Sequence, residues 1–119
     1  MSGGKRACVG VVLLVSGCVG GFRPALHSPD PAARIRAIRQ AAENGDRAVL
    51  PLLVDRLEDE DEAVRFYAIA ALTRMTGTDM GYKYYKPFPE RLAAVKRWRH
   101  YAREQATAGA STQTASYER

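Results

Sequence analysis

The sequence predicts an all-α protein, built as a short stack of about four helices with a flexible segment at each end. Three observations predict this class. Between Pro29 and Glu104, apolar residues recur at spacings of three and four, which is the period of an amphipathic helix. Asp, Pro and Gly stand where the periodic segments start and stop, as they do at helix ends. The chain also resembles itself internally, which is typical of stacked helical pairs.

Residues at the helix ends define the first two helices. Asp30 is an N-cap residue, and Pro31 suits the first helical position. Gly45 predicts the end of this helix. Asp46 can cap a second helix, where Pro51 is tolerated because it lies in the first turns. The residues expected to face inward are Ile35, Ile38, Ala42, Val49, Leu50, Leu53 and Leu57.

Two more helices follow the acidic run Glu58–Glu62. The third is expected from Ala63 to Thr76, and Gly77 predicts its end. The fourth is expected from Glu90 to Glu104, after a loop. The residues expected to face inward are Val64, Ala68, Ile69, Leu72, Met75, Leu92, Val95 and Trp98.

The chain contains an internal repeat whose sequence is similar to that of a known repeat family. Asp30-Pro-Ala-Ala-Arg34-Ile-Arg-Ala-Ile aligns with Asp61-Glu-Ala-Val-Arg65-Phe-Tyr-Ala-Ile. Residues 50–72 then resemble one full HEAT repeat, with a Pro in the outer helix, an acidic turn, a Val-Arg pair and an Ala-rich inner helix. Residues 30–42 resemble the inner helix of a preceding, truncated repeat. This resemblance covers about residues 29–77.

The resemblance implies structural roles for the repeated polar residues. Asp30 and Asp61 would cap the inner helices. Arg34 and Arg65 would lie between repeats and pair with the turn Asp of the neighbouring repeat. A ligand-binding role is the alternative for these four residues. Because helical repeats need about three units to be stable, the last helix is expected to cap the stack through Trp98, or the chain to form a homodimer.

The first residues of the chain have the features of a secretory signal. Lys5 and Arg6 precede a short apolar run, 7–15, and a small-residue site ending in Cys18. The apolar run is much shorter than the roughly 20 residues of a membrane-spanning helix. Val15-Ser16-Gly17-Cys18 resembles the lipobox of bacterial lipoproteins. In that family, the signal is cut before the Cys, whose sulfur receives a diacylglycerol.

The lipobox resemblance implies where the protein resides. We expect a mature protein that starts at Cys18 and is held by its lipid in the bacterial cell envelope, facing the periplasm or exterior. The absence of Asp after the lipidated Cys favours the outer membrane. A cleaved secretory signal with a soluble product, or an apolar N-terminus of a cytoplasmic protein, are the alternatives. Cys18 would be the only Cys left, so no internal disulfide is expected.

The expected organisation therefore has four parts. Residues 1–17 form the lipoprotein signal peptide, and residues 18–29 form the lipid anchor and flexible tether. Residues 30–104 form the HEAT-like helical domain. Residues 105–119 are small, polar and low in complexity, which predicts a disordered tail.

Two segments could bind a partner. The loop before the last helix contains Tyr82, Tyr84 and Tyr85, which could form an aromatic platform for a peptide, glycan or lipid headgroup. The alternative is that the rings fold back over the open end of the stack. The last helix has a basic run around Trp98 that includes Arg99, which could contact an acidic partner or anionic lipid. A solvated helix face is the alternative.

Neither composition nor motifs favour catalysis or nucleic-acid binding. The net charge is +5, and two of these positive charges, Lys5 and Arg6, belong to the expected signal peptide. This balance does not predict a nucleic-acid partner. No catalytic motif, metal-ligand spacing or phosphate-binding Gly loop occurs in the sequence, so no cofactor and no metal are expected. A non-catalytic module that binds an envelope protein is favoured, with a membrane-surface protein or, from the bilin lyases that contain HEAT-like repeats, an enzyme as alternatives.

Overall fold

The computed structural model describes residues 22–115, and these residues contain helices and no strand. The elements, in chain order, are α1 (Phe22–Ala25), α2 (Pro31–Asn44), the 3-10 helix η1 (Arg47–Val49), α3 (Leu50–Asp55), the 3-10 helix η2 (Arg56–Glu58), α4 (Glu62–Thr76) and α5 (Phe88–Ala115). The predicted all-α class is therefore confirmed.

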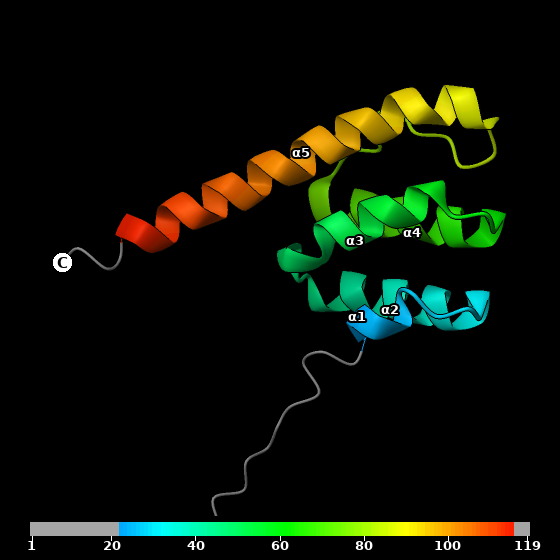
Figure 1. The fold of residues 1–119 in the computed structure, drawn as a ribbon, viewed down its shortest axis with the longest axis horizontal. Helices are drawn as coiled ribbons and strands as arrows, with labels where there is room; N and C mark the ends of the chain where they lie inside the picture. Colours follow the sequence, from blue (N-terminus) through cyan, green and yellow to red (C-terminus); the bar gives the residue numbers. More distant parts are fainter. Residues whose placement is uncertain (1–21, 116–119) are drawn as a thin grey trace, which may run out of the picture.

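The helices form a stack of three layers (Figure 1). The first layer holds α1 and α2, and the second holds the segment η1–α3–η2 together with α4. α2 packs against α4, while α3 packs against both α4 and α5. The long helix α5 lies across the second layer and closes the stack. This arrangement is the predicted helical-hairpin stack, with α5 as its last layer.

The helix ends lie where the cap residues predict them. Asp30 accepts a hydrogen bond at Oδ1 from Ala32 N (3.0 Å), and Asp61 accepts one at Oδ1 from Val64 N (3.0 Å). Gly77 follows α4 in the left-handed conformation, with φ 82°, a region that L-residues with a Cβ rarely adopt. The expected capping roles of Asp30 and Asp61 are confirmed.

A single hydrophobic core joins the three layers. Trp98 of α5 is fully buried in it, and its Nε1 donates a hydrogen bond to Asp79 O (3.1 Å). The indole therefore holds α5 on the stack through both packing and a satisfied polar group. The other large, fully buried side chains are Tyr82, Leu26, Ile38, Leu50, Leu53, Leu57, Leu72, Val49, Val54, Val64 and Val95.

The fold begins earlier than the sequence predicts. Leu26 is fully buried in the core, and Arg34 Nη1 donates a hydrogen bond to Ser28 O at 2.7 Å. The tether predicted for residues 18–29 is therefore corrected, because residues 22–28 pack against α2. A single Leu among Pro, Gly and Ser has no helical period, so the sequence pattern does not reveal it. The predicted signal peptide and Cys18 lie outside the described residues.

The last helix is longer at both ends than the predicted Glu90–Glu104. It continues to Ala115, which corrects the disordered tail predicted from residue 105. Ala has the highest intrinsic helix propensity. The hydroxyls of Thr107 and Ser111 donate to the carbonyls of Arg103 (2.7 Å) and Thr107 (3.1 Å), so they bond within the helix instead of interrupting it. The end of α5 extends beyond the other helices (Figure 1).

No helix among the described residues combines the length and the apolar character that crossing a bilayer requires.

Candidate functional site

A buried carboxylate joins the two repeats. Asp59, in the turn before α4, accepts a hydrogen bond at Oδ1 from Arg34 Nη2 of α2 (3.0 Å) and another at Oδ2 from Arg56 Nη1 (3.2 Å). The backbone N–H of Asp61 also donates to Oδ1 (3.0 Å). Arg34 therefore pairs across the repeats as expected, but its partner is Asp59 rather than Asp61. The side chain of Asp61 already caps α4, which explains why Arg34 pairs with Asp59 instead.

The second repeat Arg makes backbone bonds in place of the expected pair with a turn Asp. Arg65 Nη1 donates to Asp59 O (2.8 Å) and Glu60 O (3.0 Å). Its Nε donates to Tyr84 O (3.1 Å). Arg65 is buried and connects the acidic turn to the Tyr-containing loop, and its Nη2 lies 3.8 Å from Glu62 Oε2. Both repeat Arg side chains thus bond to other segments of the domain.

The loop between α4 and α5 folds over the end of the stack. Tyr82 is buried, and its hydroxyl donates to Leu57 O at 2.5 Å. Arg97 of α5 donates from Nε (3.0 Å) and Nη2 (2.8 Å) to Met80 O. Asp79 accepts from Gly81 N (2.8 Å) and pairs with Lys83, and these bonds lower the pKa of its carboxyl.

Burial corrects two of the predicted partner-binding residues. Tyr82 and Trp98 are 2 % and 0 % exposed, so neither offers a partner more than a trace of surface. Tyr82 holds the loop in place, and Trp98 holds the last helix. The position of Tyr82 agrees with the alternative given above, in which rings of the loop fold back over the end of the stack.

Tyr84 and Tyr85 behave differently: half-buried Tyr84 packs against the edge of the core and contacts exposed Phe66 of α4, while exposed Tyr85 contacts Tyr84. We call Phe66, Tyr84 and Tyr85 the aromatic face. The rings of Phe66 and Tyr84 lie edge to face with centroids 5.1 Å apart, and those of Tyr84 and Tyr85 are 5.2 Å apart. Phe66 is 43 % exposed and Tyr85 is 58 % exposed. A groove of about 400 Å³ lies at this face, lined by Phe66, Ile69, Ala70, Thr73, Asp79, Tyr82, Lys83, Tyr84 and Tyr85.

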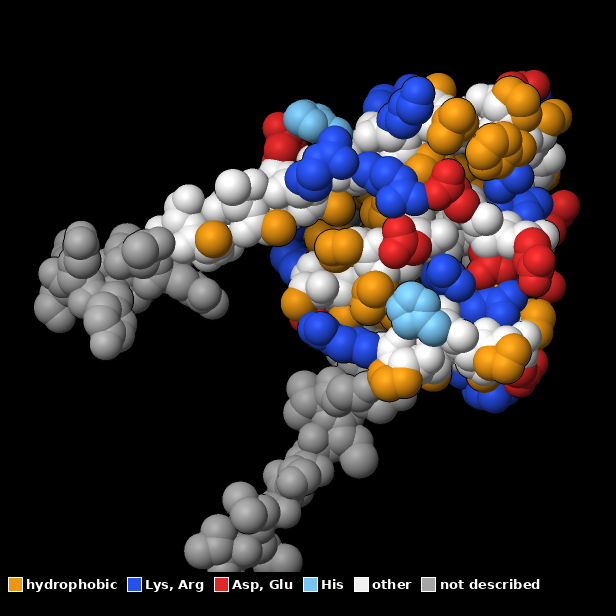
Figure 2. Space-filling view, viewed as in Figure 1, with side chains coloured by type: hydrophobic (Ala, Val, Ile, Leu, Met, Phe, Trp, Pro, Cys, Tyr) orange, Lys and Arg blue, Asp and Glu red, His pale blue; other side chains and the backbone are white. Residues whose placement is uncertain are grey.

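Phe66 is the residue of the aromatic face that the sequence analysis did not single out. Its signal was present, since Phe66 lies between the inward positions Val64 and Ala68 and therefore on the outer side of α4. Phe88, at the start of α5, is 53 % exposed. Hydrophobic side chains gather over this end of α5 and the adjoining loop, at the upper right of Figure 2.

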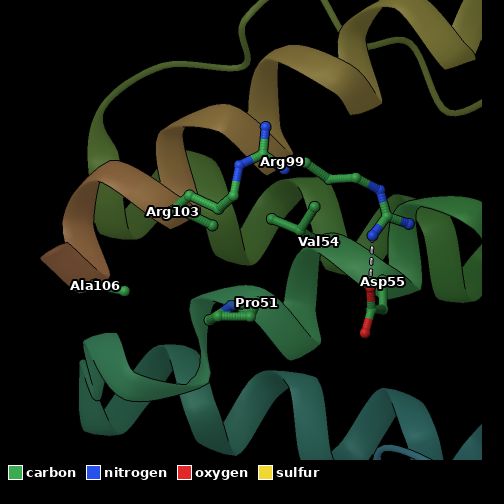
Figure 3. A pocket seen from close by; sticks show the side chains of 7 residues that line it. Pro51, Val54, Asp55, Arg99, Arg103 and Ala106 are labelled. Atoms are coloured by element: carbon green, nitrogen blue, oxygen red, sulfur yellow. Dashed lines mark hydrogen bonds and ion pairs between the residues drawn. The ribbon is translucent and has the colours of Figure 1, made fainter.

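Arg99, predicted to bind a partner, forms ion pairs within the protein. It donates from Nη1 to Asp55 Oδ1 (3.1 Å), and its Nη2 pairs with Glu58. The hydrogen bond with Glu58 is the main reason that the pKa of Arg99 is raised. Figure 3 shows Arg99 reaching from α5 towards Asp55 at a hollow of about 200 Å³, lined by Pro51, Val54, Asp55, Arg99, Ala102, Arg103 and Ala106. Arg99 therefore links α5 to α3 and η2, and its side chain is 41 % exposed.

Of the other basic residues in the run around Trp98, some already have a partner within the protein and some do not. Arg97 is bonded to the loop, and His100 pairs with Glu104 at 3.1 Å. Lys96 and Arg103 form no ion pair within residues 22–115. Residues 22–115 contain no group of three His, Cys, Asp or Glu side chains able to hold a metal ion.

The architecture and the comparison of sequences agree on the family. The family model for HEAT repeats matches residues 21–107, which is most of the chain and spans all three layers. The chain belongs to the HEAT-repeat family. HEAT repeats generally mediate interactions between proteins and are typically non-catalytic. No curated protein and no solved structure matches this HEAT-repeat chain.

Proposed function

We propose that this protein is a lipid-anchored lipoprotein of the bacterial envelope, outer membrane favoured, whose HEAT domain binds another envelope protein without catalysis. The anchor would be the lipid on Cys18, in agreement with the lipobox-like Val15-Ser16-Gly17-Cys18. The binding surface would be the aromatic face. A homodimer remains the alternative occupant of that surface.

The exposure of Phe66 and Tyr85 is the observation that carries this proposal. Aromatic side chains with large exposed areas cluster at interfaces, because removing them from water on binding is favourable. Here they stand beside a groove, and aromatic residues in grooves are typical interaction hot spots.

The aromatic face is also held in a fixed position, which favours binding. Arg65 fixes the backbone of Tyr84 through a hydrogen bond to its carbonyl, and buried Tyr82 anchors the loop in the core. A surface that is ordered before binding loses less conformational entropy when its partner arrives. The loop is therefore suited to recognition.

The alternative of a membrane surface bound by the basic last helix has less support. Arg97, Arg99 and His100 already have partners inside the domain. Lys96 and Arg103 are left to contact anionic lipid, and each basic residue near such a surface contributes only about 1 kcal/mol. The aromatic face is the better candidate.

Photo-crosslinking of the full chain in its native envelope tests the proposal. A photoreactive amino acid at position 85 should crosslink to a distinct protein, whereas the same group at exposed position 96 should not. Membrane fractionation and intact mass of the wild type beside Cys18→Ser should show acyl mass and membrane retention only in the wild type. An unmodified chain that keeps Met1 in the soluble fraction would refute the anchor. The absence of any specific crosslink at position 85 would refute the binding surface.

A further inference from the structure

We propose that the exposed face of α4 binds an acidic peptide segment, which places one apolar side chain against the aromatic face and its carboxylates against Arg74 and Arg39. This inference rests on the proposed function, because it names the chemistry of the partner for the same surface. Its evidence is the shape and charge of the surface beside the aromatic groove.

Two hollows meet on α4. The groove of the aromatic face reaches Ala70, and a second hollow of about 190 Å³ begins there, between α2 and α4. Phe66, Ala70 and Arg74 follow one another at intervals of four residues, and all three are exposed. They therefore form one ridge along the helix. The second hollow is lined by Arg39 and Glu43 of α2 and by Ala70 and Arg74 of α4, among others.

The charge available on this surface is mainly positive. Arg39 and Arg74 are exposed and form no ion pair within residues 22–115, unlike Arg36, which lies 3.8 Å from Asp30. Glu43 is the acidic residue that lines the second hollow. In the aromatic groove, the charge of Asp79 is already compensated by Lys83 at 3.1 Å. Two guanidinium groups are thus available for carboxylates, which they bind in a bidentate manner.

The spacing along α4 predicts the spacing in the peptide. Arg74 follows Phe66 by eight residues, which corresponds to about 12 Å along a helix. An extended peptide rises about 3.3 Å per residue, so about four residues cover this distance. The apolar side chain and the carboxylate should therefore stand three to four residues apart. This separation distinguishes a specific segment from a chain that is merely acidic.

An array of synthetic peptides probed with the labelled full chain in detergent tests the inference. The peptides carry one Phe or Leu and a Glu-Glu pair whose nearer Glu stands one to six positions from the apolar residue. Matched peptides have Lys in place of Glu, or Ser in place of the apolar residue. We expect binding to be strongest at three to four residues, to be lost with Lys or Ser, and to weaken with added salt.

Charge reversal on the protein provides the matched control. Arg74→Glu and Arg39→Glu should each weaken binding of the best acidic peptide by about tenfold, because a like charge then faces the carboxylates. Lys96→Glu makes the same charge change on α5, away from both hollows, and should leave binding unchanged. Thermal unfolding of the three variants shows that each remains folded.

Several outcomes would overturn the inference. Acidic and basic peptides could bind equally, or Arg74→Glu could behave like Lys96→Glu. Binding of the full chain to vesicles containing anionic phospholipid, lost in Arg74→Glu and without any peptide binding, would identify lipid as the ligand instead. A protein that crosslinks at position 85 as strongly in Arg74→Glu as in the wild type would leave the proposed function standing and refute the acidic segment.

Discussion

Arg34 of α2 and Asp59 of the second repeat form a buried ion pair, with 3.0 Å between Nη2 and Oδ1. Asp59 also forms an ion pair with Arg56 and accepts a hydrogen bond from the backbone N–H of Asp61. The carboxylate thus connects one repeat to the next and fixes the turn from which α4 begins. Because both charges are removed from water, loss of one partner leaves the other uncompensated.

The Asp59→Ala variant should therefore be strongly destabilised. Removing one partner of a buried pair costs about 3–5 kcal/mol, because Arg34 remains buried without its counter-ion. The control is Glu60→Ala, whose side chain is exposed in the same turn and should change stability by no more than about 0.5 kcal/mol. Urea unfolding of both variants measures the difference. Equal midpoints would contradict the role given to Asp59.

The Leu26→Ala variant tests where the fold begins. Leu26 is fully buried, and truncation of a buried Leu costs about 2–5 kcal/mol. The neighbouring His27 is exposed, so His27→Ala should have little effect. A thermal unfolding midpoint for Leu26→Ala close to that of His27→Ala would show that the segment before α2 lies outside the fold.

Two glycines should respond to alanine in opposite directions. Gly81 has φ 76°, and a Cβ there would lie 3.2 Å from Arg97 Nη2, so Gly81→Ala should destabilise the loop by about 1 kcal/mol or more. Gly109 lies within α5, where a Cβ would meet nothing within 4 Å. Gly109→Ala should stabilise the helix by up to about 1 kcal/mol. Thermal unfolding of both variants should give shifts of opposite sign.

Tyr82 should make stability sensitive to alkaline pH. Burial raises the pKa of Tyr82 above its ordinary value of 10.0, because the ionised ring would lose solvation in the core. The unfolded chain therefore releases this proton first, and the contribution of Tyr82 to stability, fully present below pH 10, falls as the pH rises towards the folded pKa. Tyr82→Phe should remove the part of the alkaline loss of stability that comes from Tyr82. At neutral pH it should cost about 0.5–1.5 kcal/mol, through loss of the hydrogen bond to Leu57 O.

Urea unfolding between pH 8 and 11 measures the decline for the wild type, Tyr82→Phe and Tyr85→Phe. Tyr85 is exposed, so its variant should follow the wild type. A curve for Tyr82→Phe that parallels the wild type would contradict a buried, neutral Tyr82.

The local features of the fold could be predicted from the sequence. Asp30 and Asp61 cap helices through bonds to residues two and three positions away, and Gly77 ends α4 through its own backbone conformation. Such interactions are encoded within a few residues. The inward-facing positions follow from the helical period for the same reason, as Leu53 and Trp98 demonstrate.

The features that depend on distant contacts could not be predicted in this way. Asp59 is one of five acidic residues in its turn, and only its distance to Arg34 of another helix distinguishes it from its neighbours. Tyr82 and Tyr85 are close in sequence, yet the fold buries one and exposes the other. The sequence pattern therefore pointed to the loop that contributes Tyr84 and Tyr85 to the aromatic face, but it predicted Tyr82 and Trp98 to be accessible, whereas both are buried.

The order of the layers also determines which way the molecule faces. α1, where the described chain begins, lies in the first layer (Figure 1), whereas the aromatic face is formed by α4 of the second layer and the loop that leads into α5. If the chain is held at its N-terminus, as proposed above, the helical stack would act as a spacer between the membrane and Tyr85. A partner would then be met in the aqueous space in front of the membrane rather than at the bilayer itself.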